Sequence, residues 1–229
     1  MRQHLETLQQ YSDIITKYIQ NSLFNPENME YLKASDAESE TTMTLPITIF
    51  DDNPNVNSVI VAYRVNDDSY GEIEAYYKCV VDDRSKSDLI IIVDVPREYD
   101  ERFREYIDGE LADALGHELQ HSCESPEIMN VKIPEGIEKW ESVENVWAHF
   151  GSDVETKGYV VGFFLRSLTL AKQGREVDPY DIMDQYVMNQ IYQRGVQQGL
   201  NEQELQPIIK KVYDKWSTFL ENVISEYYD

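Results

Sequence analysis

The sequence predicts an α+β fold in which an N-terminal helix and a small mixed sheet precede a largely helical C-terminal half. Segments rich in Val, Ile and Tyr lie between residues 44 and 95, and such segments are typical of strands. After Pro96 the apolar residues recur every three or four positions, which is the period of an amphipathic helix. We therefore expect a single domain over 1–229, with a helix-plus-sheet part at 1–96 and a helical part at 97–229.

The elements of the first half follow from the spacing of apolar side chains. Between Leu5 and Ile19 this spacing predicts a helix, and the polar residues 25–42 are expected to form a loop. Strands are predicted at 44–50, 59–65, 71–81 and 88–95. The turn residues at 66–69 are expected to join the second and third strands as a hairpin. The third strand alternates in polarity, so one of its faces should be wet. The fourth is apolar on both faces and should lie inside the sheet.

The second half predicts helices around a long connection. The first helix carries an apolar stripe from Phe103 to Leu119 and ends near Ser122. Residues 124–151 show no long period, and a connection of this length is usually functional or hides a short helix. Further helices are predicted from 152 to just before 174, from Asp178-Pro179 onward, and along 208–223 with a start or kink at Pro207.

The composition excludes several classes of function. Hydrophobic residues make up 41 % of the chain and aromatic residues 11 %, which is typical of a folded globular protein. The chain has 43 Asp and Glu against 20 Lys and Arg, a formal net charge of −23. Because such a surface repels phosphate groups, we expect no nucleic-acid partner and no membrane partner, whereas basic partners are favoured. Nothing in the sequence indicates the oligomeric state.

The cysteines and the apolar runs predict a cytoplasmic location. Two cysteines, Cys79 and Cys123, are too few for a disulfide scaffold. The longest apolar runs, 89–93 and 159–165, are much shorter than the ~20 residues that span a membrane. The N-terminus has no apolar signal region. We therefore expect the protein inside a bacterial or phage-infected cell, or carried in a particle.

The most informative segment is His117-Glu118-Leu119-Gln120-His121, at the end of the first helix of the second half. Two histidines four residues apart lie one above the other on a helix, so both imidazoles can reach one metal ion. Glu118 lies one step round the helix, where it can take a proton from a metal-bound water. Zinc suits this set, because a catalytic zinc has three protein ligands and an open position. The alternative is a pair of surface histidines at the C-terminal end of a helix, where positive charge suits the dipole.

This segment resembles the H-E-x-x-H helix of the zincin metallopeptidases, and the order of sheet, motif helix and helical half is similar to their architecture. Three and six residues past the second histidine stand Glu124 and Glu127, not the Gly and His of the metzincin branch. The resemblance is therefore to the gluzincin branch, in which a Glu from a later helix is the third ligand. It implies a zincin-like fold, a Zn²⁺ cofactor held by His117 and His121, and peptide hydrolysis with Glu118 as general base.

Glu155 is the candidate for that third ligand. Ser152 and Glu155 also have the spacing of a capping box, which needs no metal. The rival ligands are His149, Asp153 and Glu144.

Several residues near the motif are candidates for supporting roles. Asp113, one turn before His117, either holds that imidazole through its second nitrogen or is a solvated carboxylate. Tyr159 and His149 are candidates to donate a hydrogen bond to the developing oxyanion. Gly116 predicts a close approach of another backbone.

The sequence thus predicts a zinc-dependent peptidase that acts on a peptide or protein substrate, with basic substrates favoured. An extended peptide could add to an exposed sheet edge near the metal. One alternative is a catalytically inactive zincin-like assembly or interaction protein, in which the metal's fourth position would be filled by protein. Another is a metal-free α+β binding domain, which would contain no stoichiometric zinc.

Overall fold

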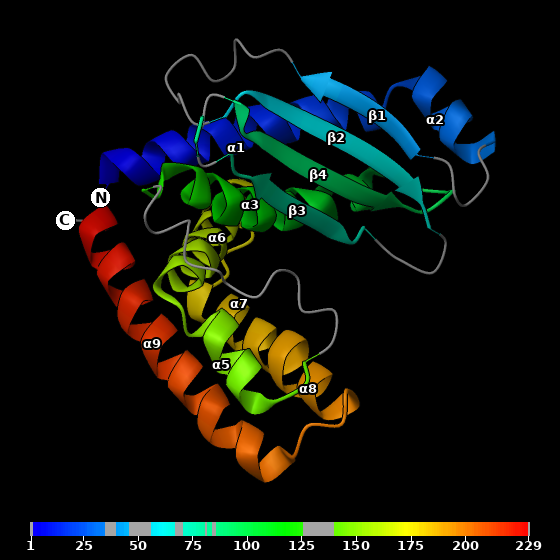
Figure 1. Ribbon diagram of the computed structural model, residues 1–229. Coiled ribbons are helices and arrows are strands. Elements are labelled where there is room, and N and C mark those ends of the chain that lie inside the picture. Colours follow the sequence, from blue (N-terminus) through cyan, green and yellow to red (C-terminus); the bar gives the residue numbers. More distant parts are fainter. Residues whose placement is uncertain are drawn as a thin grey trace.

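A four-stranded sheet lies over the long helices α1 (Arg2–Leu23) and α3 (Glu101–Cys123), and the remaining helices of the second half pack below them, as Figure 1 shows for the computed structural model. The structure describes residues 2–34, 40–45, 56–66, 71–80, 82–83, 86–125 and 140–228. The predicted α+β class is confirmed, and so is the N-terminal helix. The core lies between the sheet and α3, and it continues between α3 and the helices below.

The sheet order is β1-β2-β4-β3. Its strands are β1 (Glu40–Leu45), β2 (Ser58–Val65), β3 (Ile73–Lys78) and β4 (Asp88–Val95). β4 pairs in parallel with β2 and antiparallel with β3, and β1 pairs antiparallel with β2. The interior position predicted for the fourth strand is confirmed. The predicted hairpin of the second and third strands is wrong, because β4 lies between them.

The physical reason for this order is the difference between β3 and β4. β4 is apolar on both faces and is best buried between two neighbours. β3 exposes Glu74, Tyr76 and Lys78 on one face, as its alternation predicted, and an edge position leaves these polar groups in water. Local turn residues indicated only that the chain reverses and not which strand it then pairs with.

Two other predictions for the first half need correction. The segment expected as a loop contains α2 (Pro26–Ala34), which begins where Asn25 Oδ1 accepts a hydrogen bond from the N–H of Glu27 at 2.9 Å. Leu32 of this helix is buried in the core, so tertiary packing supports a helix that the polar composition concealed. The first strand runs from Glu40 to Leu45 instead of 44–50, and residues 46–50 lie outside the described part of the chain.

The second half is helical, as predicted. After α3 follow α5 (Val143–Phe150), α6 (Asp153–Lys172), α7 (Pro179–Tyr186), the π-helix η3 (Val187–Gln193), α8 (Arg194–Gln197) and α9 (Glu202–Tyr228). The long connection contains the short helix α5, one of the two alternatives stated for it, and 126–139 lie outside the described residues. α9 begins before Pro207, which therefore lies inside this helix. None of the helices within the described ranges is long and apolar enough to cross a membrane.

The packing of α6 against α3 positions the candidate site, and it depends on glycine. A Cβ atom on Gly116 of α3 would lie 3.0 Å from the Cα of Gly162 on α6, and a Cβ on Gly162 would lie 2.7 Å from the backbone oxygen of Asp113. Both distances are shorter than normal carbon contacts, so only glycine allows the two helix backbones to come this close. The close approach predicted for Gly116 is thus observed, and its partner is α6.

Candidate metal centre

The two motif histidines converge at the C-terminal end of α3. The Nε2 atoms of His117 and His121 are 2.8 Å apart, and the ring planes are perpendicular. Only 11 % and 8 % of the two side chains are exposed. Burial of this extent does not fit the alternative of two surface histidines that only complement a helix dipole.

Glu155, in the first turn of α6, reaches both imidazoles. Its Oε2 lies 3.2 Å from Nε2 of His117, and its Oε1 lies 3.7 Å from Nε2 of His121. The capping alternative is also partly present, since Ser152 Oγ accepts a hydrogen bond from the N–H of Glu155 at 3.2 Å. Ser152 therefore caps the helix, while the Glu155 carboxylate is free to face the histidines.

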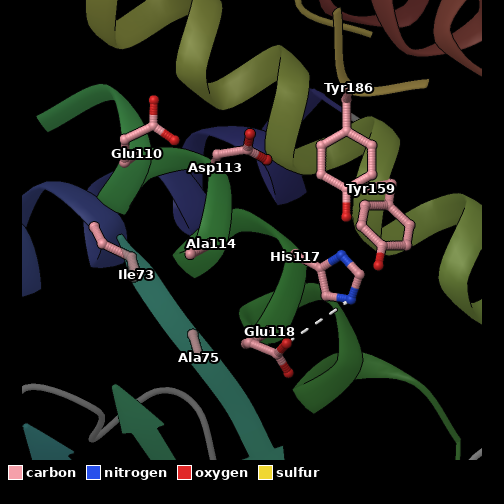
Figure 2. A pocket seen from close by; sticks show the side chains of 9 residues that line it. All are labelled: Ile73, Ala75, Glu110, Asp113, Ala114, His117, Glu118, Tyr159 and Tyr186. Carbon is pink, nitrogen blue, oxygen red and sulfur yellow. Dashed lines mark ion pairs between the residues drawn. The ribbon is translucent and has the colours of Figure 1, made fainter. Parts of the chain in front are cut away.

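Glu118 lies beside the histidines on the side of the sheet. One carboxylate oxygen is 3.8 Å from Nε2 of His117, the ion pair drawn as a dashed line in Figure 2. The other oxygen accepts a hydrogen bond from the backbone N–H of Tyr77 in β3, at 2.8 Å. The edge strand therefore holds this carboxylate in place next to the imidazole pair.

The rival ligands do not join this group. Asp153 is largely exposed and pairs with Lys215, and Glu144 is exposed at the start of α5. His149 lies closer to the motif histidines, but its Nε2 is 3.4 Å from the hydroxyl of Tyr159. Within the described residues, His149 interacts with Glu155 and the motif histidines only through longer-range charge. Among the predicted third ligands, Glu155 is therefore the one that the fold brings to the imidazoles.

The donor atoms fit a zinc ion. Tetrahedral ligands at about 2.0–2.1 Å from zinc are separated by about 3.3 Å, and the observed separations of 2.8, 3.2 and 3.7 Å surround this value. Among the residues described, His117, Glu118 and His121 form a group whose ligand atoms all lie within 4.8 Å of one another. The two imidazoles and the carboxylate of Glu155 are also ligand types that zinc prefers.

A glycine on α6 makes room for the two rings. A Cβ on Gly158 would lie 3.0 Å from Cε1 and Nδ1 of His117 and 3.0 Å from Cε1 of His121. A side chain at this position would therefore displace both imidazoles, whereas glycine leaves room for them. Glu155 and Gly158 lie about one turn apart on the same helix, so α6 supplies both the carboxylate and the space.

The charges of the site are strongly coupled. Burial would lower the pKa of His117, but the hydrogen bond to Glu155 and the nearby carboxylates outweigh this effect and raise it to about 9. Burial would raise the pKa of Glu155, but its hydrogen bonds to both histidines hold it well below the usual range. Burial raises the pKa of Glu118, which brings a carboxylate closer to the range useful for proton transfer near neutral pH.

Asp113 has neither of the two roles predicted for it, as an orienting partner of His117 or as a solvated carboxylate. Its carboxylate is 16 % exposed and lies 3.4 Å from Nη1 of Arg166, a residue of α6, so it is not a solvated group. No hydrogen bond to His117 is found between these two described residues, and it influences that imidazole only through its charge. Burial raises the pKa of Asp113 to about 6, and the charge of Arg166 partly offsets this rise.

The pocket next to the motif has a volume of about 210 Å³. Figure 2 shows its lining, which comprises Ile73, Ala75, Glu110, Asp113, Ala114, His117, Glu118, Tyr159 and Tyr186. Tyr159 packs edge-on against His117, with ring centroids 4.3 Å apart. Of the two predicted oxyanion donors, Tyr159 therefore lines the pocket and His149 does not.

Sequence reasoning missed Tyr186, which lines the pocket, and Arg166, which pairs with two carboxylates that line it. Tyr186 is the last residue of α7, directly before the π-helix, and π-helical turns are frequent at functional sites. That signal exists only in the structure. Arg166 had no local motif, because its partners Glu110 and Asp113 lie on another helix.

The chain matches no protein-family model, and comparison with curated proteins and with solved structures finds no significant match. The interpretation of this site therefore depends on its own geometry and on the motif.

Proposed function

We propose that the protein is a zinc-dependent peptidase of zincin-like fold. The observation that supports this proposal is the buried group of His117, His121 and Glu155, with a fourth side chain, Glu118, held beside it by a strand edge. The three donors are chemically suited to zinc, and the carboxylate of Glu118 faces the same pocket. This combination is what metal-assisted hydrolysis needs.

In this proposal His117, His121 and Glu155 hold the metal. A bound zinc ion would act as a Lewis acid and would lower the pKa of its bound water toward ~7. Glu118 accepts the proton of the attacking water and then delivers it to the nitrogen of the leaving amine. The hydrogen bond from the N–H of Tyr77 keeps the Glu118 carboxylate oriented during both transfers.

The edge of β3 supports binding of a peptide main chain. The carbonyl of Glu72 accepts a hydrogen bond from the N–H of Asp94 in β4. In an antiparallel pair, residues that bond to the neighbouring strand alternate with residues whose N–H and C=O groups face away from it. Ile73, Ala75 and Tyr77 therefore turn their N–H and C=O groups away from β4, which agrees with the bond from Tyr77 to Glu118. A substrate strand added at this edge would pass over the pocket.

The experiment combines metal analysis with a single substitution. Protein purified without added metal should contain stoichiometric zinc and should cleave an unfolded protein substrate, and a chelator should abolish cleavage. Glu118→Gln should retain zinc and lose cleavage by a factor of about 100 or more, because it removes the proton acceptor. Glu144→Gln, an exposed carboxylate one helix away, is the matched control and should cleave normally.

Two results would overturn the proposal. Cleavage that survives Glu118→Gln would remove the proposed base. Stoichiometric zinc without cleavage of any substrate in a broad peptide mixture would favour the inactive assembly or interaction protein instead.

A further inference from the structure

A second, larger cavity continues from the metal pocket along α3. It has a volume of about 760 Å³ and shares Ile73, Glu110, Asp113 and Tyr186 with the pocket of the histidines. We call it the polar bowl; the charged side chains that line it are Glu72, Glu110, Asp113, Arg166 and Arg194. The two cavities are therefore adjacent and lie between β3, α3 and α7.

The polar bowl lies at the Ile73 end of β3, whereas Glu118 is tethered at the Tyr77 end. On α3, Glu110 precedes His117 by two turns, a distance of about 10 Å along the axis. Figure 2 shows Glu110 and Asp113 on the same side of α3 as His117, further along the pocket. One extended residue advances a chain by about 3.3 Å, so a long side chain from a residue next to the cleaved bond reaches these carboxylates.

The floor of the polar bowl carries an excess of negative charge. Arg166 is the ion-pair partner of both Glu110 and Asp113, so two carboxylates share a single guanidinium. All three side chains are at most about a quarter exposed. Burial raises the pKa of both carboxyl groups, and Arg166 opposes the rise. Because one guanidinium faces two carboxylates, Arg166 compensates their charge only in part.

The rim does not change this balance. Glu72 and Arg194 both line the cavity and carry opposite charges. Arg194 is exposed, and its guanidinium lies over the ring of Trp140, 5.4 Å from the centroid. A further cation placed on the floor would therefore meet a net negative, partly desolvated site, where charge-assisted hydrogen bonds are strong.

We propose that the polar bowl binds a lysine or arginine side chain of the substrate, at a residue on the C-terminal side of the cleaved bond. This inference rests on the proposed peptidase function. The side of the bond follows from β3, because a peptide antiparallel to it, the more stable pairing, runs from the Tyr77 end toward the polar bowl. An acidic side chain would be repelled by Glu110 and Asp113, and an apolar one would desolvate their charges further without adding a cation to the single guanidinium of Arg166.

The experiment uses three peptides that differ at one position, which is lysine, norleucine or glutamate. Norleucine is unbranched and neutral, so the comparison with lysine isolates the charge. Cleavage of each is followed by mass spectrometry, which also locates the cut. Binding is measured separately to Glu118→Gln, in which the peptides stay intact. The lysine peptide should be preferred over norleucine by about tenfold in kcat/KM and in binding, the effect of one charged hydrogen bond, and over glutamate by more.

Glu110→Gln should reduce the ratio of lysine to norleucine toward one. The matched control is Glu105→Gln, which removes the same charge from an exposed position of α3 outside the cavity. It should leave the ratio unchanged, whereas a general effect of the protein's net charge would lower the ratio in both variants and overturn the proposal.

The outcomes separate the two proposals. Cleavage with equal rates for lysine and norleucine would overturn the role of the polar bowl and leave the peptidase standing. Cuts with lysine consistently on the N-terminal side would also overturn it. Lysine-selective binding that Glu110→Gln abolishes, without cleavage of any peptide, would support the polar bowl as a recognition site and contradict the peptidase.

Discussion

The two helices that form the candidate metal centre contribute to it in different ways. α3 carries His117, Glu118 and His121 within five consecutive residues, and helical geometry alone brings the two imidazoles together. α6 contributes Glu155 and Gly158, which belong to no recognisable metal-binding motif. The comparison shows that α3 carries the motif side chains, whereas the packing of α6 determines the space around them.

The close contact between the helices explains why α6 can act in this way. Gly158 lies against the imidazoles, and Gly162 lies against the backbone of α3. With larger residues at these positions, α6 would stand further away and the carboxylate of Glu155 would lose contact with the rings. Four predictions test this division of roles, ordered from the largest expected effect to the smallest.

Removal of a motif histidine should have the largest effect. His121→Ala should reduce bound zinc from stoichiometric to background, because a single imidazole and a carboxylate form an incomplete site. His149→Ala removes a histidine that contacts Tyr159 and not the proposed ligands, so this variant should retain zinc. Elemental analysis after gel filtration measures both. Equal loss from the two variants would mean that the histidines act through the fold and not as ligands.

Substitution of the α6 carboxylate should come next. Glu155→Gln should lower zinc affinity by roughly 100-fold or more. Loss of a residue that only orients a ligand already costs about 10- to 100-fold in affinity, and loss of the ligand itself should cost at least as much. Asp153→Asn alters an exposed carboxylate two residues earlier and should leave the affinity unchanged. Titration with a competing chelator gives both values. A variant Glu155→Gln with wild-type affinity would mean that another group is the third ligand.

A methyl group added to α6 should separate metal binding from stability. Gly158→Ala should lower zinc affinity about 10- to 100-fold, because its Cβ displaces both imidazoles. Gly162→Ala should instead destabilise the protein by about 1–3 kcal/mol, because its Cβ meets the backbone of α3. Chelator titration and urea unfolding measure the two effects. The same profile for both variants would contradict separate roles for the two glycines.

Loss of the cap of α6 should have the smallest effect. Ser152→Ala removes the acceptor for the N–H of Glu155 and should cost about 1 kcal/mol of stability. Ser142→Ala is a matched control, because Ser142 caps α5 in the same way through Asn145. Both variants should keep wild-type zinc affinity. A specific loss of zinc in Ser152→Ala would show that the cap also orients the Glu155 carboxylate.

Much of this architecture was predictable where the signal is local. The helix α3, the strand β4 and the cap at Asp178 follow from apolar periodicity and capping chemistry. Predictions failed where pairing partners compete. Turn residues at 66–69 suggested a hairpin, but the apolar strand β4 occupies the position between β2 and β3. Likewise α2 was expected as a loop, because its one fully buried side chain, Leu32, is too weak a signal in the sequence.

By itself, the sequence determined the paired imidazoles, because a spacing of four residues on a helix specifies their neighbours without reference to the rest of the chain. It offered Glu155 only as one carboxylate among several. Tertiary structure decided which of them reaches the histidines, and it placed the edge of β3 against Glu118 and Arg166 between Glu110 and Asp113. Such contacts join residues far apart in the chain, so they depend on how closely whole elements pack, and here that closeness depends on glycines that carry no chemistry of their own.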